Sequence, residues 1–210
     1  MSFREISSFL LPLHTDTVEF APSHSKLLCG SYELDPESRK ISGGITIFIV
    51  TGETVELLKQ HETAGVLDLS WLDDNVCFAA LSTGEICRIN LVDGPDNLKM
   101  STYPLCSSLL LSVDVLDSRA IVSAADGSLF LFDIGKSCTT TSCRAHDYEA
   151  WTAAFHRMNG NLVLSGGDDC LARVWDIRDG LEKPIFSQSR NVSFKYLAIH
   201  AKVVLEADGV

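Results

Sequence analysis

Short apolar runs broken by tight polar turns dominate the hydrophobic pattern of this chain. A β-branched or aromatic run reaches a turn containing Gly, Asp or Ser, and a second run leaves it and ends on an aromatic or aliphatic residue. The pattern is clearest in STGEICRINL from Ser82, AADGSLFLFDIG from Ala124 and GDDCLARVWDIR from Gly167. These segments predict pairs of adjacent strands and not helices.

The three segments repeat at a fixed spacing. The turn positions Gly84, Gly127 and Cys170 are 43 residues apart, and so are the strand-end positions Ile89, Phe132 and Trp175. A weaker copy, GGITIFIV, places Gly44 40 residues before Gly84. Both alternating sets of the segment LFLF are apolar, which predicts sheets buried on both faces, as in stacked blades.

A period of about 40 to 45 residues with short strands and a closing Trp-Asp is typical of the WD40 propeller repeat. We therefore predict an all-β protein built of WD40 β-propeller blades. Residues 1–190 form the blades, with repeats at about 14–50, 64–92, 108–134 and 145–178, and residues 191–210 form a divergent C-terminal tail. Residues 52–63, GETVELLKQHET, are interpreted as a strand, and residues 33–42, ELDPESRKIS, as a surface loop.

The last repeat resembles the WD40 family at four further positions. In that family His, Ser or Thr, Asp and Trp form a buried hydrogen-bonded tetrad, and the resemblance assigns it to His146, Ser165, Asp169 and Trp175. A buried indole N–H and a buried carboxylate both need partners, which His and Ser can supply. The other repeats lack the Trp and the His, so they must rely on packing.

Each polar residue near this tetrad has either a structural or a functional interpretation. Asp168 is either a solvated turn residue or a reactive carboxylate, and His146 is either a core histidine or a base. Glu149 and Trp151 stand in the loop that enters the innermost strand, where an acid beside an aromatic forms a reasonable recognition pair. Alternatively, Trp151 packs between blades. Cys170 replaces the usual turn glycine and is interpreted as a tolerated substitution.

Composition narrows the possible partners. The 210 residues carry a formal net charge of −11 and a pI near 4.9, which argues against nucleic acid, because its binders need clustered Lys and Arg. The seven cysteines lack CxxC pairs, so we expect reduced thiols in a cytoplasmic protein. No apolar run approaches the ~18 residues of a membrane span. No nucleophile elbow, phosphate loop or metal motif is present, so we expect no metal and no cofactor.

The strings AHDYEAWTAAF and SGGDDCLARVWDIR, with TDTVEFAPS and VLDLSW upstream, are more specific than a generic repeat. They resemble the WD-repeat diphthine methyl ester hydrolases of diphthamide biosynthesis, over about residues 14–190. The resemblance implies hydrolysis of the methyl ester on the modified histidine of elongation factor two. Position and chemistry make Glu149 and Asp168 the candidate catalytic carboxylates, His146 a third candidate and Trp151 a substrate-binding residue.

Propellers of that family have seven blades, whereas four repeats are recognisable here. We therefore expect an incomplete propeller, truncated at its C-terminus, with open edges that favour self-association. The segment at about residues 6–13 would supply a strand to the last blade of a full ring. The alternatives to the esterase are a non-catalytic WD-repeat scaffold that binds other proteins and an inactive truncated variant.

Overall fold

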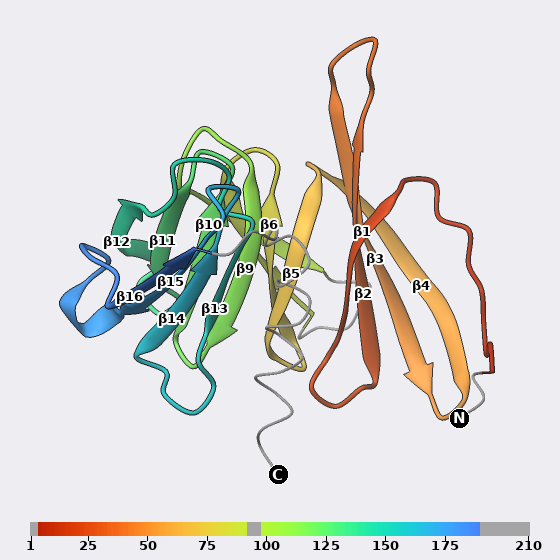
Figure 1. The fold of residues 1–210 in the computed structure, drawn as a ribbon. Helices are drawn as coiled ribbons and strands as arrows, with labels where there is room; N and C mark the ends of the chain where they lie inside the picture. Colours follow the sequence, from red (N-terminus) through yellow and green to blue (C-terminus); the bar gives the residue numbers. More distant parts are fainter. Residues whose placement is uncertain (1–3, 92–97, 190–210) are drawn as a thin grey trace.

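The computed structural model describes residues 4–91 and 98–189, and in them the chain forms four antiparallel sheets of four strands each (Figure 1). Sheet A contains β1 (Thr15–Phe20), β2 (Lys26–Leu34), β3 (Ile41–Thr51) and β4 (Thr54–Thr63). Sheet B contains β5 (Val66–Asp73), β6 (Val76–Leu81), β7 (Glu85–Asn90) and β8 (Lys99–Pro104). The prediction of an all-β fold is confirmed.

Sheets C and D follow the same order. Sheet C contains β9 (Leu110–Leu116), β10 (Arg119–Ala124), β11 (Ser128–Asp133) and β12 (Cys138–Arg144). Sheet D contains β13 (Thr152–Phe155), β14 (Leu162–Gly166), β15 (Leu171–Asp176) and β16 (Phe186–Ser189), with a short 3₁₀ turn at Ile177–Asp179. Each sheet ends in an outer strand that lies beyond the predicted repeat. These strands are polar and largely exposed, as in CTTTSCR of β12, so they carry little of the apolar signal.

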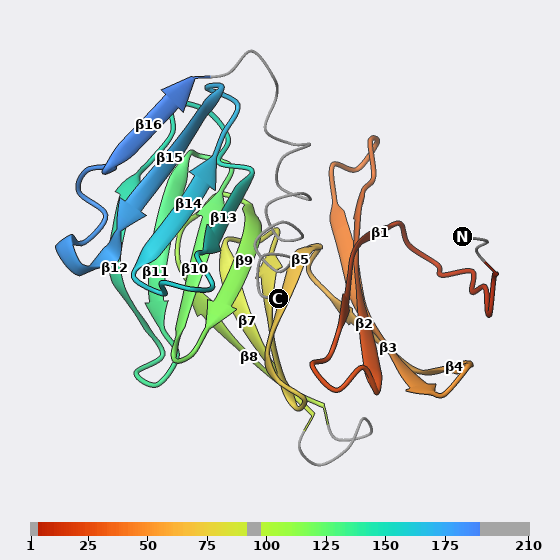
Figure 2. The ribbon, with the colours of Figure 1, turned by 60° about the horizontal axis from the view of Figure 1, so that its bottom comes forward.

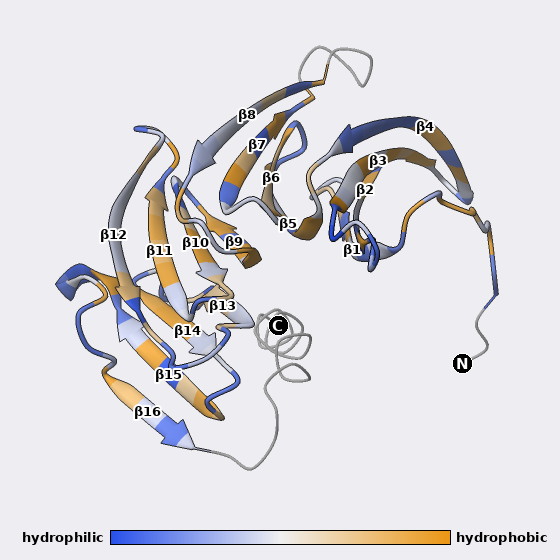
Figure 3. Cartoon of the chain, turned by 90° about the horizontal axis from the view of Figure 1, so that it is seen from above, coloured by the Kyte–Doolittle hydropathy of each residue, from blue (hydrophilic) through white to orange (hydrophobic). Residues whose placement is uncertain are grey.

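The sheets stand side by side in an arc, with the first strand of each sheet toward the centre and the fourth at the periphery (Figure 3). The inner strands β1, β5, β9 and β13 contact one another in sequence order. Three buried apolar clusters fill the spaces between sheets A and B, B and C, and C and D. Each middle sheet is therefore buried on both faces, as the apolar alternation predicts.

Residues that are 43 positions apart in the sequence occupy equivalent positions in sheets B, C and D. Ile89 pairs with Cys77, Phe132 with Ala120 and Trp175 with Val163, so these residues occupy the same place in sheets B, C and D. In sheet A this place belongs to Phe48, which pairs with Leu27. All four large side chains therefore lie on the same face of their sheets, called here the back face; the opposite face, which packs on the next sheet, is the front face.

Polar side chains join the inner strands across the sheet interfaces. Asp68 and Ser70 of β5 accept hydrogen bonds from the backbone N–H groups of Val113 and Val115 of β9 at 2.9 and 3.0 Å. At the same positions one sheet later, Ser112 and Asp114 of β9 accept from Ala153 and Phe155 of β13 at 2.9 and 2.7 Å. These contacts satisfy inner-strand donors that face a neighbouring sheet.

Several local predictions can be compared with the structure. The segment 52–63 is confirmed as strand-forming, since β4 covers most of it. The predicted loop 33–42 is partly wrong, because Glu33 pairs with Ser42 and Leu34 with Ile41. β2 and β3 thus form a long hairpin that projects above the sheets (Figure 1). Gly44 lies inside β3 and not in a turn, because this hairpin is longer than the others.

The segment preceding β1 adds no strand to any sheet in the described part of the chain, and the last blade of a full ring, to which residues 6–13 are expected to contribute, is not among the four sheets. This segment lies on the side of sheet A that faces away from the other sheets (Figure 2). The ring of Phe9 contacts the ring of Phe48 there, with 5.0 Å between centroids. The predicted tail at 191–210 lies outside the described residues.

Candidate functional site

The structure brings the four predicted tetrad residues together in sheet D. Ser165 projects from β14 and Trp175 from β15, while His146 lies in the loop before β13 and Asp169 in the turn between β14 and β15. The ring atoms Nε2 and Nδ1 of His146 lie 2.9 Å from Ser165 Oγ and 2.9 Å from Asp169 Oδ1. Trp175 Nε1 donates to Ser165 Oγ at 2.9 Å. The network ties a loop, a turn and two strands to one another.

Arg173 of β15 is a fifth member that the sequence analysis did not single out. Its Nη1 atom lies 2.7 Å from Asp169 Oδ2 and 2.8 Å from His146 Nδ1. Burial raises the pKa of Asp169, but the hydrogen bonds from Arg173 and His146 outweigh that effect, so the pKa lies below its ordinary value. The carboxylate is therefore charged at neutral pH and paired with the guanidinium.

Burial lowers the pKa of His146, and the hydrogen bond and charge of Asp169 offset this only in part. The imidazole is consequently neutral at neutral pH. Two contacts compete for Nδ1: with a proton it donates to Asp169 Oδ1, and without one it accepts from Arg173 Nη1, which can only donate. In either tautomer Nε2 is hydrogen-bonded to the Ser165 hydroxyl, whose oxygen also accepts from Trp175.

The order Ser165, His146 and Asp169 resembles the arrangement of a serine hydrolase triad. The network differs from such a triad in the accessibility of the serine to a substrate. Ser165 is 4% exposed and Trp175 is 3% exposed, and the indole N–H occupies the hydroxyl oxygen that would have to attack a substrate. This geometry describes a structural network and not an activated nucleophile.

The tetrad positions the backbone of the two candidate carboxylates. The N–H of Asp168 donates to the carbonyl oxygen of Glu149 at 2.9 Å, which joins the turn to the loop before β13. Gly167 makes this approach possible, since a Cβ there would lie 2.7 Å from Cγ and Nδ1 of the His146 ring. Glu149 and Asp168 therefore stand in adjacent segments held by one buried network.

The candidate residues differ in accessibility. Asp168 is exposed, whereas Glu149 and Trp151 are half-buried. His146 is 2% exposed and both ring nitrogens are engaged, so the geometry argues against the hypothesis that it takes a proton from substrate. Cys170 is exposed and has a φ of 60°, the conformation of Gly84 and Gly127 at the same turn position.

A second buried polar pair was also missed. Asp114 Oδ1 accepts from Arg157 Nη2 at 2.6 Å, and the Asp114 side chain is fully buried. The pair borders a cavity of about 320 Å³ that also touches Trp71, His24 and Glu19. The sequence does carry a signal for these polar contacts. Polar residues recur at regular spacing in the apolar inner strands, first as Asp68 and Ser70 and then as Ser112 and Asp114.

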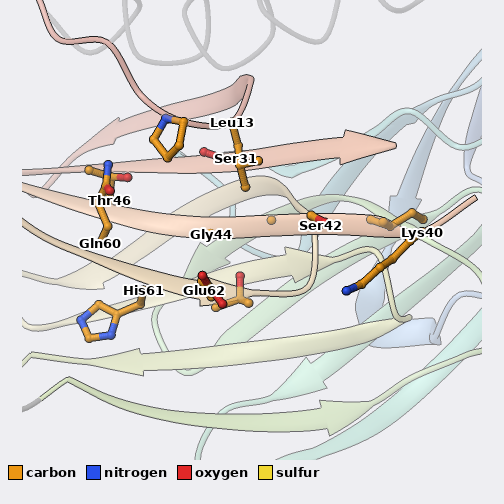
Figure 4. Close-up of a pocket in the computed structure, with 13 residues that line it drawn as sticks. Leu13, Ser31, Lys40, Ser42, Gly44, Thr46, Gln60, His61 and Glu62 are labelled. Atoms are coloured by element: carbon orange, nitrogen blue, oxygen red, sulfur yellow. The ribbon is translucent and has the colours of Figure 1, made fainter. Parts of the chain in front are cut away.

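Two larger cavities lie on sheet A, at the other end of the stack from Glu149 and Asp168. One of about 630 Å³ is shown in Figure 4, between Leu13 and the polar end of the back face with Ser31, Gly44, Thr46 and Glu62. Another of about 540 Å³ lies between Phe9, Leu11 and the apolar end of that face. They are spaces between the N-terminal segment and a sheet face, and neither touches the candidate carboxylates.

Among the described residues, no group of three or more His, Cys, Asp and Glu side chains is arranged to hold a metal ion. No helix in the same residues has the length and apolar character to cross a membrane.

The fold and the tetrad define the class of this protein. Residues 136–176 match the family model "WD domain, G-beta repeat". A chain in the crystal structure of a mitotic checkpoint complex superposes with a TM-score of 0.73 at 17% identity, covering 90% of this chain and 55% of that one. The chain is a WD40-repeat protein with the fold of part of a β-propeller.

Similarity over most of the chain connects it to one group of WD40 proteins. The diphthine methyltransferase homolog of Dictyostelium discoideum is 30% identical over 200 residues, covering 78% of this chain and 54% of that protein. The diphthine methyltransferases of Schizosaccharomyces pombe and Homo sapiens are each 28% identical, covering 72% and 79% of this chain and 48% and 47% of theirs. The resemblance to this family is confirmed, and the chain spans about half the length of these relatives.

Proposed function

We propose that this chain acts in diphthamide biosynthesis by hydrolysing the methyl ester of diphthine on elongation factor two. The observation that carries the proposal is the similarity to proteins named diphthine methyltransferase over most of the chain. The backbone hydrogen bond from the Asp168 N–H to the Glu149 carbonyl supports it, because it holds two carboxylate-bearing residues, one exposed and one half-buried, in adjacent segments.

Ester hydrolysis needs a base for water and a donor for the departing alkoxide. In the proposed reaction one carboxylate removes a proton from water while the resulting hydroxide forms a bond to the ester carbonyl carbon. The tetrahedral oxyanion then collapses and the bond to the methoxy oxygen breaks. The protonated side chain returns its proton to the methoxide, so the products are methanol and the substrate's carboxylic acid, which loses a proton to solvent and becomes a free carboxylate. This scheme consumes one water and needs no cofactor.

Glu149 is the better candidate for the base. Glu149 is half-buried, so its carboxylate has fewer alternative orientations in which to hold a water, whereas Asp168 is exposed. Asp168 and Trp151 then orient the substrate in the proposed scheme. Elongation factor two is accordingly the proposed protein partner, in the cytoplasm.

The test is methanol release from elongation factor two that carries methylated diphthine, without any added methyl donor. We expect turnover by the purified chain, a loss of at least about 100-fold in Glu149→Gln and a smaller loss in Asp168→Asn. Asp126→Asn is the matched control, because Asp126 lies in the corresponding turn of sheet C and should leave the rate unchanged.

Three outcomes would contradict the proposal. Transfer of a methyl group from S-adenosylmethionine to the factor would instead support a transferase, the activity in the relatives' names. Binding of the factor by a folded, monodisperse sample without methanol release would support the scaffold alternative. Equal turnover in wild type and both variants would eliminate the carboxylates as the reacting groups.

A further inference from the structure

The proposed hydrolysis places negative charge beside side chains that are themselves negative. When hydroxide adds to the ester carbonyl carbon, the carbonyl oxygen becomes an oxyanion, and enzymes stabilise this charge with fixed hydrogen-bond donors. Asp147 and Glu149 stand on the loop before β13, and Asp168 is hydrogen-bonded to that loop through its backbone. Three carboxylates would repel an oxyanion that forms beside them. The reaction therefore needs a cationic donor at the same place.

Arg144 is the cationic residue closest in sequence to Asp147 and Glu149. It is the last residue of β12, it is exposed, and the loop with Glu149 follows it directly. No Lys or Arg occurs in the turns and loops at this end of sheets B, C and D, which are residues 82–84, 105–109, 125–127 and 167–170. Arg173 of β15 is already engaged in the tetrad network, and its side chain is only 15% exposed. Arg144 is thus the cation that a substrate can reach at this end of the sheets.

The loop doubles back, so that both of its ends bind one turn of sheet C. Its first two residues donate their N–H groups to the carbonyl oxygen of Gly127 at 2.9 Å, and Ala150 N–H donates to the carbonyl oxygen of Ala124 at 3.2 Å. Gly127 N–H donates to the same Ala124 oxygen at 3.1 Å, which makes this a tight turn whose first and last Cα atoms lie within about 7 Å. Arg144 and Glu149 adjoin the anchored residues, so their backbones are neighbours in space.

The guanidinium of Arg144 is held in place without being neutralised. Its Nη2 atom donates to the carbonyl oxygen of Asp147 at 3.2 Å, and in the described part of the chain it forms no ion pair. Four other arginines pair with carboxylates, namely Arg4, Arg157, Arg173 and Arg178. A guanidinium has five N–H donors in a planar fork that fits the two oxygens of a carboxyl group. The contact with Asp147 uses one donor and leaves the others for a ligand.

We propose that Arg144 is a catalytic residue of the proposed hydrolysis, and that its guanidinium donates hydrogen bonds to the ester carbonyl oxygen and stabilises the oxyanion. The inference rests on the proposed function. As the water activated by Glu149 adds to the carbonyl carbon, the electron pair of the C=O bond moves onto the oxygen that Arg144 holds. The pair returns when the bond to the methoxy oxygen breaks, and the methoxide takes the proton from Glu149. A bound protein substrate covers the exposed guanidinium and excludes water, which strengthens the interaction.

Methanol release by variants of Arg144 tests the assignment. Arg144→Ala should lower kcat and kcat/KM alike, at least about 100-fold, because the interaction forms mainly in the transition state. Arg144→Lys keeps the charge but lacks the planar fork, so its rate should lie between those of Arg144→Ala and wild type. Both variants should unfold at the wild-type temperature, since the side chain is exposed. Arg178→Ala, which removes another exposed guanidinium beyond the far end of β15, is the matched control and should keep the wild-type rate.

Chemical rescue separates a direct role of the guanidinium from an effect on net charge. Millimolar guanidinium ion should restore part of the kcat of Arg144→Ala in a saturable manner and leave wild type unchanged. Equal rescue by sodium chloride would overturn the inference, because the loss would then reflect ionic strength alone. Wild-type turnover in Arg144→Ala, or a loss confined to KM, would overturn it while the proposed function stands. Absence of methanol release by wild type would remove both.

Discussion

Cys170 is held in a backbone conformation that residues with a Cβ avoid. Its φ is 60°, close to the 81° and 86° of Gly84 and Gly127 at the same turn position. This conformation costs a non-glycine residue about 1–2 kcal/mol, whereas glycine loses roughly 0.5–1 kcal/mol more backbone entropy on folding. We expect Cys170→Gly to raise the free energy of unfolding by up to about 1 kcal/mol, measured by urea denaturation.

The matched variant at the neighbouring turn is Gly127→Ala. A Cβ there would lie 2.2 Å from the carbonyl oxygen of His146, in addition to the strained φ. It should therefore lower the free energy of unfolding by more than about 1 kcal/mol. A lower stability of Cys170→Gly than of wild type would contradict this account of the turn.

His146 gives the stability a pH dependence. Its pKa is lower in the folded protein than the ordinary 6.5, chiefly because the ring is buried; the hydrogen bond and charge of Asp169 oppose this effect, and the charge of Arg173 adds to it. As pH falls below about 6.5 the unfolded chain takes up the proton first. The free energy of unfolding therefore falls with pH from that point down to the lower folded pKa.

Long-range ¹H–¹⁵N NMR of the imidazole measures this directly. We expect His146 to be mostly neutral at pH 6.5 and to titrate at lower pH, with the chemical shifts of the two ring nitrogens reporting which of them carries the proton. A midpoint at or above 6.5 would mean that the ion pair with Asp169 outweighs burial. Ser165→Ala should shift the midpoint, because it removes the hydroxyl that is hydrogen-bonded to Nε2.

The residue types explain how much of the site was predictable. The grouping of His146, Ser165, Asp169 and Trp175 was predicted from the resemblance to the WD40 family, and the chemistry agrees with it because a buried indole and a buried carboxylate each need a partner. Arg173 was missed although it stands two residues before Trp175, because the side chain of an arginine in a strand usually points to solvent. The pairing of the Asp168 and Glu149 backbones depends on loop geometry that the sequence does not encode locally.

At the scale of elements, the connections between inner strands set the stability of the stack. Asp114 is fully buried and serves both Phe155 N–H and Arg157 of the next sheet. Asp114→Ala should lower the free energy of unfolding by about 2–4 kcal/mol, because it leaves a donor and part of a guanidinium without their partner. Ser70→Ala, at the same place in sheet B, removes one neutral acceptor and should cost about 1 kcal/mol.

Thermal or urea denaturation of both variants tests this difference. Equal effects would show that the charge of Asp114 contributes nothing beyond its backbone contact. The double variant with Arg157→Leu should recover part of the loss, since it removes the guanidinium that Asp114→Ala leaves unpaired.

The predictability of the elements follows their burial. The inner three strands of each sheet carry the apolar residues from which the repeats at 64–92, 108–134 and 145–178 were predicted. The outer strands β4, β8, β12 and β16 are polar on most positions, so only β4 was anticipated. The β2–β3 hairpin extends through residues predicted as loop because strand pairing between Glu33 and Ser42 needs no apolar side chains.

At the scale of the whole molecule, the stack is a row of sheets in which the ends have one neighbour and the middle sheets have two. In such arrays stability depends on the contacts between neighbours, so the ends should open more easily than the middle. The cysteines of the described chain are free and lie in all four sheets or their turns. Their rates of reaction with a thiol reagent therefore show which sheets open more easily.

We expect Cys138 and Cys170, which are exposed, to react within the first phase in native buffer. Cys29, Cys77 and Cys87 are buried, and burial raises the pKa of Cys87 and of the partly buried Cys143 to about 11, so their reaction requires opening of the sheets. Among these, Cys29 of the terminal sheet A should react before Cys77 and Cys87 of sheet B as urea is raised below the unfolding midpoint. Mass spectrometry of labelled peptides resolves the order. Simultaneous reaction of all three would instead show that the stack opens as one cooperative unit, with the terminal sheet as stable as its neighbour.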